Sequence, residues 1–229
     1  YGIYYPDEGH IFVDGKEVKI RSPKDSYELG IGMVHQHFKL VDVLTAAENI
    51  ILGLPGKGKL DMKKITEDIQ KLVDKYGFEM DLSQKIYEMS VSQKQTVEII
   101  KMLYRGARIL ILDEPTAVLT PQEADRLFDI LRNMRADGCS IMIITHKLQE
   151  VLALSDRVAI LRKGQYIDTV ETAQANVQSL SEMMVGARVD LNIERPQPQN
   201  VKKRLVVKGL NCRNKDSVKT LDDIDLSVN

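Results

Sequence analysis

Two adjacent carboxylates follow a short apolar run in the middle of the chain. The run is Ile109-Leu-Ile-Leu112, and Asp113 and Glu114 come directly after it. Open α/β sheets bind ligands at the carboxyl ends of their parallel strands. A carboxylate pair in that place suits phosphoryl transfer, because one carboxylate can hold Mg²⁺ and the other can orient or deprotonate the attacking water. The alternative is that Asp-Glu-Pro is only the exit of a strand into a turn.

A histidine and a glutamine occupy comparable positions after other apolar runs. His146 follows Ile141-Met-Ile-Ile144, where its imidazole can hydrogen-bond a terminal phosphate as charge builds in the transition state. Gln36 follows an apolar segment and can reach a metal ion or the attacking water. Each signal is weak alone, since a lone histidine at a strand end is more often structural. His35 and His37 flank Gln36, but no further Cys or His lies nearby, which argues against a zinc-type site.

A candidate anion site opens the helix that we predict from Val91 to Tyr104. The residues at its start are Ser90, Val91, Ser92 and Gln93. Ser90 and Gln93 form a capping-box pair. Free backbone N–H groups and the helix dipole favour an anion at such a helix start. Taken alone, the stretch favours the alternative interpretation of a well-capped helix without a ligand.

The elements that must position these residues follow a strand, helix, strand pattern. Between the apolar runs at 109–112 and 141–144, a helix is expected with Thr120 as its N-cap, Glu123 three residues later and Gly138 after its end. Strands that are apolar on both faces and joined by a helix are typical of a buried parallel sheet. The carboxylates and the histidine should then meet at one edge of that sheet.

The remaining chain predicts further elements and a possible second domain. A helix is expected over 66–76 from its apolar period. Asp14-Gly15 is typical of a type I′ hairpin in a β-rich opening, and Lys163-Gly164 is expected to turn a second hairpin. Residues 189–203 read as a linker, and 204–229 read as fresh strands. The chain begins within an element and ends before a second core, so we expect it to be truncated at both ends.

Composition excludes few classes. The chain of 229 residues is 43% hydrophobic and 28% charged, which is enough apolar material for a core. The formal net charge of −1 gives no argument for nucleic acid as a partner. Two distant cysteines fit a reducing compartment. No apolar run approaches the roughly 18 residues of a membrane span, so a membrane role is expected to act through a partner.

The order and spacing of these residues resemble those of the ATP-binding cassette (ABC) ATPases. The Q-loop, signature motif, Walker B motif and switch histidine of that family correspond in order to Gln36, Ser90 to Gln93, Ile109 to Glu114, and His146. The runs at 35–41 and 44–50 are most similar to the nucleoside and simple-sugar importer branch. The resemblance covers 1–188 as most of one nucleotide-binding domain, and 204–229 resembles the opening strands of a second.

The resemblance implies a fold and a set of roles. The fold is an α/β P-loop NTPase-like domain with a mainly parallel core sheet, an antiparallel N-terminal β-region and an α-helical subdomain at about residues 54–105. ATP and Mg²⁺ are the implied cofactors. Asp113 would hold Mg²⁺, Glu114 would be the catalytic base, Gln36 would contact metal and water, and His146 would contact the γ-phosphate. Ser90, Val91, Ser92 and Gln93 would face the ATP bound by an opposing domain.

The resemblance also implies partners and a location. Membrane permease subunits would contact the surface around residues 41–53, and a second nucleotide-binding domain would complete the ATP sandwich. An extracytoplasmic solute-binding protein would act indirectly. The implied location is cytoplasmic, peripheral on the inner face of the cell membrane.

The sequence departs from the family pattern in three places. It contains no G-x-x-x-x-G-K-[S/T] phosphate loop, which we expect upstream of Tyr1. The charge-assisted hydrogen bonds that such a phosphate loop makes to ATP are worth about 1.5–3 kcal/mol each. Without them, the chain alone is predicted to hydrolyse ATP negligibly. Ser92 stands where the family has glycine, and Thr120 stands where many relatives have Asp. Two alternatives stay open, a non-catalytic regulatory or assembly module with a degenerate ATP site and a soluble ABC ATPase not tied to transport.

Overall fold

The computed structural model describes residues 1–4, 6–54, 60–188, 202–215 and 217–228. The chain forms two compact units, of which the first comprises Tyr1–Val158 with Val170–Ala175, and the second comprises Ala159–Thr169 with Asn176–Asn229. All the candidate site residues lie in the first unit. The predicted linker at 189–203 falls almost wholly outside the described residues, and the domain ranges 1–188 and 204–229 stay predictions.

A three-stranded parallel sheet lies at the centre of the first unit. Its strands are β3 (Ile31–Val34), β4 (Ile109–Asp113) and β5 (Ser140–Ile144), in the order β3-β4-β5. Val34 pairs with Leu112, and Asp113 pairs with Ile144, so the three strands end nearly level. The predicted parallel sheet is therefore confirmed.

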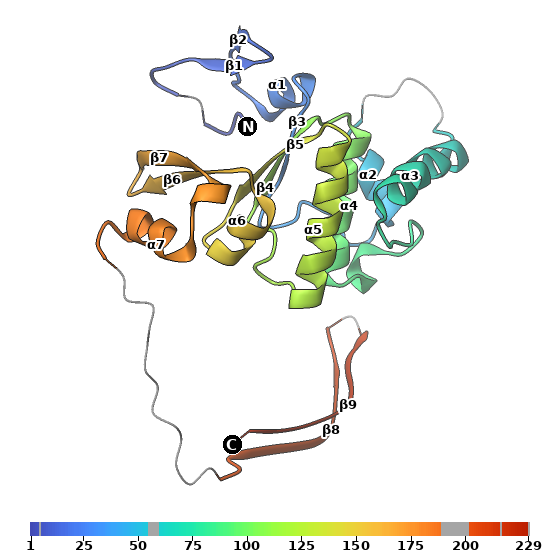
Figure 1. Ribbon diagram of the computed structural model, residues 1–229. Coiled ribbons are helices and arrows are strands. Elements are labelled where there is room, and N and C mark those ends of the chain that lie inside the picture. The colour runs from blue at the N-terminus through green and yellow to red at the C-terminus, as the bar shows by residue number, and fades with distance from the viewer. Residues whose placement is uncertain (5, 55–59, 189–201, 216, 229) are drawn as a thin grey trace. The chain divides into compact units, whose positions relative to one another are not determined.

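Helices gather on one side of this sheet (Figure 1). They are α2 (Ala46–Ile51), α3 (Met62–Tyr76), α4 (Val91–Tyr104) and α5 (Pro121–Ala136). The bounds of α4 agree with the prediction, and its Ser90–Gln93 capping box is present. Helix α2 was missed, although Thr45 and Glu48 form a capping box that could have indicated it.

Close packing of α4 against the sheet depends on one glycine. A Cβ at Gly32 in β3 would lie 2.9 Å from the Cβ of Met102 and 3.0 Å from that of Ala107. A side chain there would therefore push α4 off the strand whose end carries Gln36.

The two faces of β4 and β5 are buried unequally. Leu110 and Leu112 of β4 are fully buried in a core that includes Leu131 of α5. Met142 and Ile144 of β5 are 57% and 48% exposed. Successive strand residues point to opposite faces, so only the face toward α4 and α5 is fully covered. The expectation that β5 is buried on both faces was wrong.

Smaller elements surround these layers. The first unit also contains β1 (Ile11–Val13), β2 (Lys16–Val18), α1 (Pro23–Glu28), η1 (Ile86–Glu88), α6 (Leu148–Leu154) and η2 (Thr172–Gln174). β1 and β2 pair antiparallel, and both turn residues, Asp14 and Gly15, have positive φ, as a type I′ turn requires.

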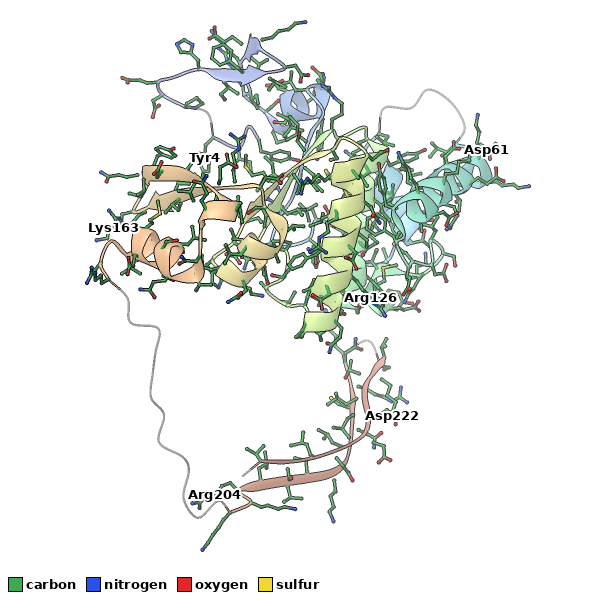
Figure 2. The ribbon with its side chains drawn as sticks, in the orientation of Figure 1. Tyr4, Asp61, Arg126, Lys163, Arg204 and Asp222 are labelled. Carbon is green, nitrogen blue, oxygen red and sulfur yellow. The ribbon has the colours of Figure 1, made fainter. Side chains whose placement is uncertain are left out.

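The hairpin strands β6 (Arg157–Arg162) and β7 (Gln165–Glu171) form a two-stranded sheet, with Lys163 at the tip between them (Figure 2). The second unit contains α7 (Val177–Val185) and the antiparallel pair β8 (Leu205–Arg213) and β9 (Lys219–Val228). Across the described ranges, no helix is long and apolar enough to cross a membrane.

Candidate functional site

Four of the predicted site residues lie at or just after the carboxyl ends of the three parallel strands, at one edge of the sheet. β3 ends two residues before Gln36, β4 ends with Asp113 and is followed by Glu114, and β5 ends two residues before His146. Parallel pairing in register makes this convergence unavoidable, because all carboxyl ends of parallel strands face the same way. The structure therefore brings together four residues from a stretch of more than 100 positions, from Gln36 to His146.

A pocket opens at this edge. Its polar lining includes Gln36, Asp113, Glu114 and Gln95, and Phe38 covers part of its wall. The other lining residues are Val34, His35, Leu112, Pro115, Ala117 and Val118. His146 is not part of the lining and joins the site through Glu114.

Glu114 and His146 are in direct contact. Oε1 of Glu114 lies 2.8 Å from Nδ1 of His146, and the two side chains are 20% and 72% exposed. The other carboxylate oxygen, Oε2, is buried and has no hydrogen-bond partner among the described residues. Buried polar atoms are almost always satisfied, so an unpaired oxygen in a pocket indicates a place for a donor from a ligand or water.

The main chain of Glu114 is held in an unusual conformation. Its φ is +47°, in the left-handed region, which costs about 1–3 kcal/mol for a residue with a side chain. Its N–H donates to the carbonyl oxygen of Ile144 at 2.8 Å, so the adjacent strand β5 holds the bend. Residues kept in such conformations cluster at functional sites.

A second set of contacts ties the loop after Glu114 to the helix after His146. The hydroxyl of Thr116 is buried and donates to the carboxylate of Glu150 at 2.6 Å. Nζ of Lys147 donates to the carbonyl oxygen of Thr116 at 2.7 Å and lies 3.3 Å from Glu150. These contacts keep Glu114 and His146 on segments that cannot move apart independently. The sequence analysis missed them, because nothing local pairs Thr116 with a residue 34 positions away.

Gln95 is another site residue that the sequence analysis missed. Its side chain is buried in α4 and its Nε2 donates to the carbonyl oxygen of Pro115 at 2.8 Å. It also lines the pocket. The only available signal was a glutamine inside the predicted helix, and a surface position would explain it equally well.

The polar side chains at the start of α4 form hydrogen bonds with other groups of the same chain. Oγ of Ser90 accepts from the N–H of Gln93 at 3.3 Å, and Oε1 of Gln93 accepts from the N–H of Ser90 at 2.9 Å. Oγ of Ser92 donates to Oε1 of Glu123 at 2.7 Å. The stretch Ser90 to Gln93 does not line the pocket with Gln36 and Asp113, so a role for it toward the ATP of another domain stays a prediction.

The carboxylate of Glu123 is strongly hydrogen-bonded at this point. The N–H of Thr120, the hydroxyl of Ser92 and the hydroxyl of Thr120 hold the pKa of Glu123 below its usual value. A negative charge is thereby kept beside the first turn of α4, where an anion would otherwise be favoured.

The donor set fits a nucleotide-bound magnesium ion better than a protein-only metal cage. Within the part of the chain that the structure describes, no group of three or more His, Cys, Asp and Glu could hold a metal ion. Mg²⁺ commonly takes one or two protein oxygens and completes its shell with phosphate and water. The carboxylate of Asp113 and the amide oxygen of Gln36 line one pocket and are donors of that kind. Glu114, whose buried Oε2 has no partner among the described residues, lines the same pocket.

Comparison with known proteins assigns the family. The sequence profile of the ABC transporter family matches residues 1–117. The chain therefore belongs to the ABC transporter family.

Relatives with assigned names include several import proteins. The chain is 47% identical to the nucleoside import ATP-binding protein NupA of Lactococcus lactis over 93% of its length, which is 42% of that protein. It is 44% identical to the guanosine import ATP-binding protein NupO of Bacillus subtilis, covering 100% of this chain and 45% of NupO. It is 40% identical to the glucose import ATP-binding protein TsgD13 of Haloferax volcanii, covering 100% of this chain and 47% of TsgD13. The chain thus spans about half the length of these relatives.

Solved structures agree on the fold. A nucleotide-free ATP-binding cassette from an ABC transporter superposes with a TM-score of 0.65 at 25% identity, covering 74% of this chain and 72% of that one. CbiO1 from Clostridium perfringens, part of the ABC transporter complex cbiONQ, gives a TM-score of 0.65 at 26% identity, with 80% and 72% covered. The α/β fold predicted for an ABC cassette is confirmed.

Proposed function

We propose that the polypeptide carrying this chain binds and hydrolyses ATP to energise the import of a nucleoside or a simple sugar. The observation that carries this proposal is the meeting of Gln36, Asp113, Glu114 and His146 at one edge of the sheet. Glu114 lines the pocket there, and its Oε2 has no hydrogen-bond partner in the part of the chain that the structure describes. The relatives NupA, NupO and TsgD13 are named as nucleoside, guanosine and glucose import proteins. These names support a nucleoside or a simple sugar as the solute.

Each residue has a distinct role in this proposal. Asp113 and Gln36 would hold Mg²⁺, which would supply charge neutralisation for the phosphates. Glu114 accepts a proton from the attacking water at Oε2, the oxygen that His146 leaves free. His146 holds the other oxygen before ATP binds, and it donates to the terminal phosphate once ATP is bound.

The two contacts of His146 compete with each other. A singly protonated imidazole donates from one nitrogen only. When Nδ1 donates to Glu114, Nε2 is left as an acceptor, whereas donation from Nε2 to a phosphate makes Nδ1 an acceptor. Phosphate binding by the neutral ring therefore releases Oε1 of Glu114.

The partners follow from the same proposal. The stretch Ser90 to Gln93 faces ATP held by a second nucleotide-binding domain, which 204–229 begins. Membrane permease subunits dock on the surface after Gln36, where Val41 and Val43 are exposed. A solute-binding protein outside the membrane delivers the solute, and the protein works at the inner face of the cell membrane.

The experiment compares the natural polypeptide that carries this chain with the 229-residue chain alone. We expect Mg²⁺-dependent ATP hydrolysis from the former and negligible hydrolysis from the latter, because the phosphate-cradling run is absent from this sequence. The polypeptide is then reconstituted with its permease in vesicles, and uptake of a labelled nucleoside and of labelled ribose is measured. Hydrolysis without ATP-dependent uptake of either solute class would contradict the import proposal.

A non-catalytic assembly or regulatory module is the second candidate. The observation that favours it is the contact between Ser92 and Glu123, which places a side chain and a carboxylate where the family has glycine. Such a module would bind ATP and its partners in the same preparation without turnover above background. Equilibrium binding of ATP measured beside turnover separates the two candidates.

A further inference from the structure

Helix α4 carries a buried pair of opposite charges outside the pocket. Glu98 and Lys101 lie one turn apart and are only 4% and 8% exposed. Nζ of Lys101 is 3.6 Å from Oε1 of Glu98. Charged side chains are rarely buried to this extent, and the cost of removing two charges from water often exceeds their mutual attraction. Stability alone therefore does not account for this pair.

Glu98 and Lys101 both form hydrogen bonds with the main chain of Lys39. The N–H of Lys39 donates to Oε1 of Glu98 at 3.2 Å. Nζ of Lys101 donates to the carbonyl oxygen of Lys39 at 3.3 Å. The carboxylate thus accepts from the N–H of the peptide unit before the Lys39 Cα, and the ammonium donates to the C=O of the peptide unit after it, so both main-chain polar groups of Lys39 meet a charge of the matching sign.

Lys39 lies just after the site residue Gln36. On the other side of Gln36, strand β3 is fixed by the pairing of Val34 with Leu112. The segment 35–38 forms no helix or strand, and it is therefore held by its two ends. Both Gln36 and Phe38 in this segment line the pocket.

The same pattern of contacts recurs two residues later. Asn49 of α2 is fully buried. Its Oδ1 accepts from the N–H of Val41 at 2.8 Å, and its Nδ2 donates to the carbonyl oxygen of Val41 at 3.1 Å. Buried side chains from two helices thus hold alternate residues of the coil between Gln36 and the exposed Val43.

We propose that Glu98 and Lys101 are positioning residues for Gln36. By fixing the main chain of Lys39 they hold Gln36 beside Asp113 and Glu114, and they link its position to α4, whose first turn carries Ser90 to Gln93. The anchoring of Lys39 stands on the contacts alone, whereas its effect on turnover rests on the proposed function.

The test is the double substitution E98M/K101M in the natural polypeptide. Methionines fill similar space, and replacing a whole buried ion pair by apolar residues is often neutral or stabilising, so the fold is expected to persist. We expect amide hydrogen exchange at Lys39 to become at least about fivefold faster, because one main-chain hydrogen bond is lost. We expect kcat to fall about 10-fold with little change in KM for ATP, since a misplaced group near the reacting atoms costs up to 100-fold.

Two comparisons separate positioning from a general structural effect. The variant D68M/K71M makes the same replacements at an exposed pair of the same spacing on α3, and it should leave exchange at Lys39 and kcat unchanged. In a Q36A background, E98M/K101M should cause no further loss of turnover, because residues that act through one another are not additive. K101R keeps the charge and its donors and should retain most of the protection at Lys39.

Several results would overturn the inference. Unchanged exchange at Lys39 removes the anchor, and faster exchange with unchanged kcat removes its link to Gln36. A full additional loss in the Q36A background shows that the pair acts by another route. If the double variant does not fold, E98A serves instead, because it removes the acceptor of the Lys39 N–H, and unchanged exchange at Lys39 with unchanged kcat in E98A overturns the inference. If the unaltered polypeptide shows no ATP hydrolysis, the proposed function fails, and exchange at Gln36 and Lys39 alone then decides whether the pair positions this segment.

Discussion

Glu114 and His146, on the ends of adjacent parallel strands, share a hydrogen bond of 2.8 Å between Oε1 and Nδ1. The second oxygen of Glu114 is buried and has no hydrogen-bond partner within the described segments, and Glu114 lines one pocket with Asp113 and Gln36. The carboxylate thus has one oxygen held by His146 and one that no described residue holds.

Glu114→Gln should abolish turnover while leaving ATP binding intact. The amide keeps the size of the side chain but cannot accept a proton from water, and general-base catalysis typically contributes 10²- to 10⁴-fold. We expect kcat of the natural polypeptide to fall by about that factor, measured beside the Kd for ATP. Glu79→Gln, at an exposed carboxylate, serves as the control. Retention of more than about a tenth of the activity in Glu114→Gln would show that another group takes the proton.

Ser92→Gly should raise turnover severalfold in the natural polypeptide. Ser92 has no positive φ and lies in the first turn of α4, so glycine is not needed there for its backbone freedom. What glycine adds is space, together with loss of the hydroxyl that bonds Glu123. Ser92→Ala removes the hydroxyl and keeps the Cβ, and comparing kcat of the two variants separates these effects. Unchanged turnover in both variants would contradict the hypothesis that Ser92 lowers ATP hydrolysis through the site at the start of α4.

Glu123 should make the stability of the protein depend on pH in the acid range. Its pKa is lowered in the folded state, so its stabilising effect is complete above the ordinary value of about 4.3 and is lost as pH falls through the folded value. We expect Glu123→Gln to have a lower Tm than the unaltered protein at pH 7. The difference in Tm between the two proteins should shrink as pH falls from about 5 to 3. Glu79→Gln controls for the loss of one surface carboxylate. A gap in Tm that stays constant over this range would contradict the assignment.

Leu110→Ala should destabilise the first unit without touching the pocket. Leu110 is fully buried in β4 and does not line the pocket, and truncating a buried leucine costs about 2–5 kcal/mol through lost burial and the cavity left behind. Urea unfolding of the variant measures the loss. The exposed Leu60, replaced by Ala, should change the free energy of unfolding by less than about 0.5 kcal/mol. Equal effects at the two positions would mean that the core is not where the structure places it.

Local sequence signals predicted the elements well where capping and periodicity agreed. Helix α4 begins after a capping box and ends where its apolar stripe ends, and its bounds were predicted from those features. The type I′ turn at Asp14-Gly15 was equally readable, because few residue pairs tolerate positive φ at both positions. Helix α2 shows the limit of this approach, since one short turn with a capping box gives too few residues to establish a period.

Contacts between distant residues could not be predicted in the same way. The partner of Ser92 is 31 residues away, and the partner of Lys39 is 59 residues away at Glu98. Glu98 and Lys101 have the spacing of an ordinary surface ion pair on a helix, and only packing shows that they are buried. The exposure of Met142 and Ile144 also depends on which face of the sheet the helices cover, which an apolar run does not reveal.

The sequence by itself determined which residues end the parallel strands, because strand formation is local and the carboxyl ends of parallel strands point the same way. It therefore determined that Gln36, Asp113, Glu114 and His146 share an edge. Only the tertiary structure decided that His146 contacts Glu114 and that buried charges on α4 hold the coil after Gln36. It also decided that one carboxylate oxygen of Glu114 has no partner among the residues it describes. These features depend on side-chain directions and burial, and both arise only when segments far apart in the chain pack against one another.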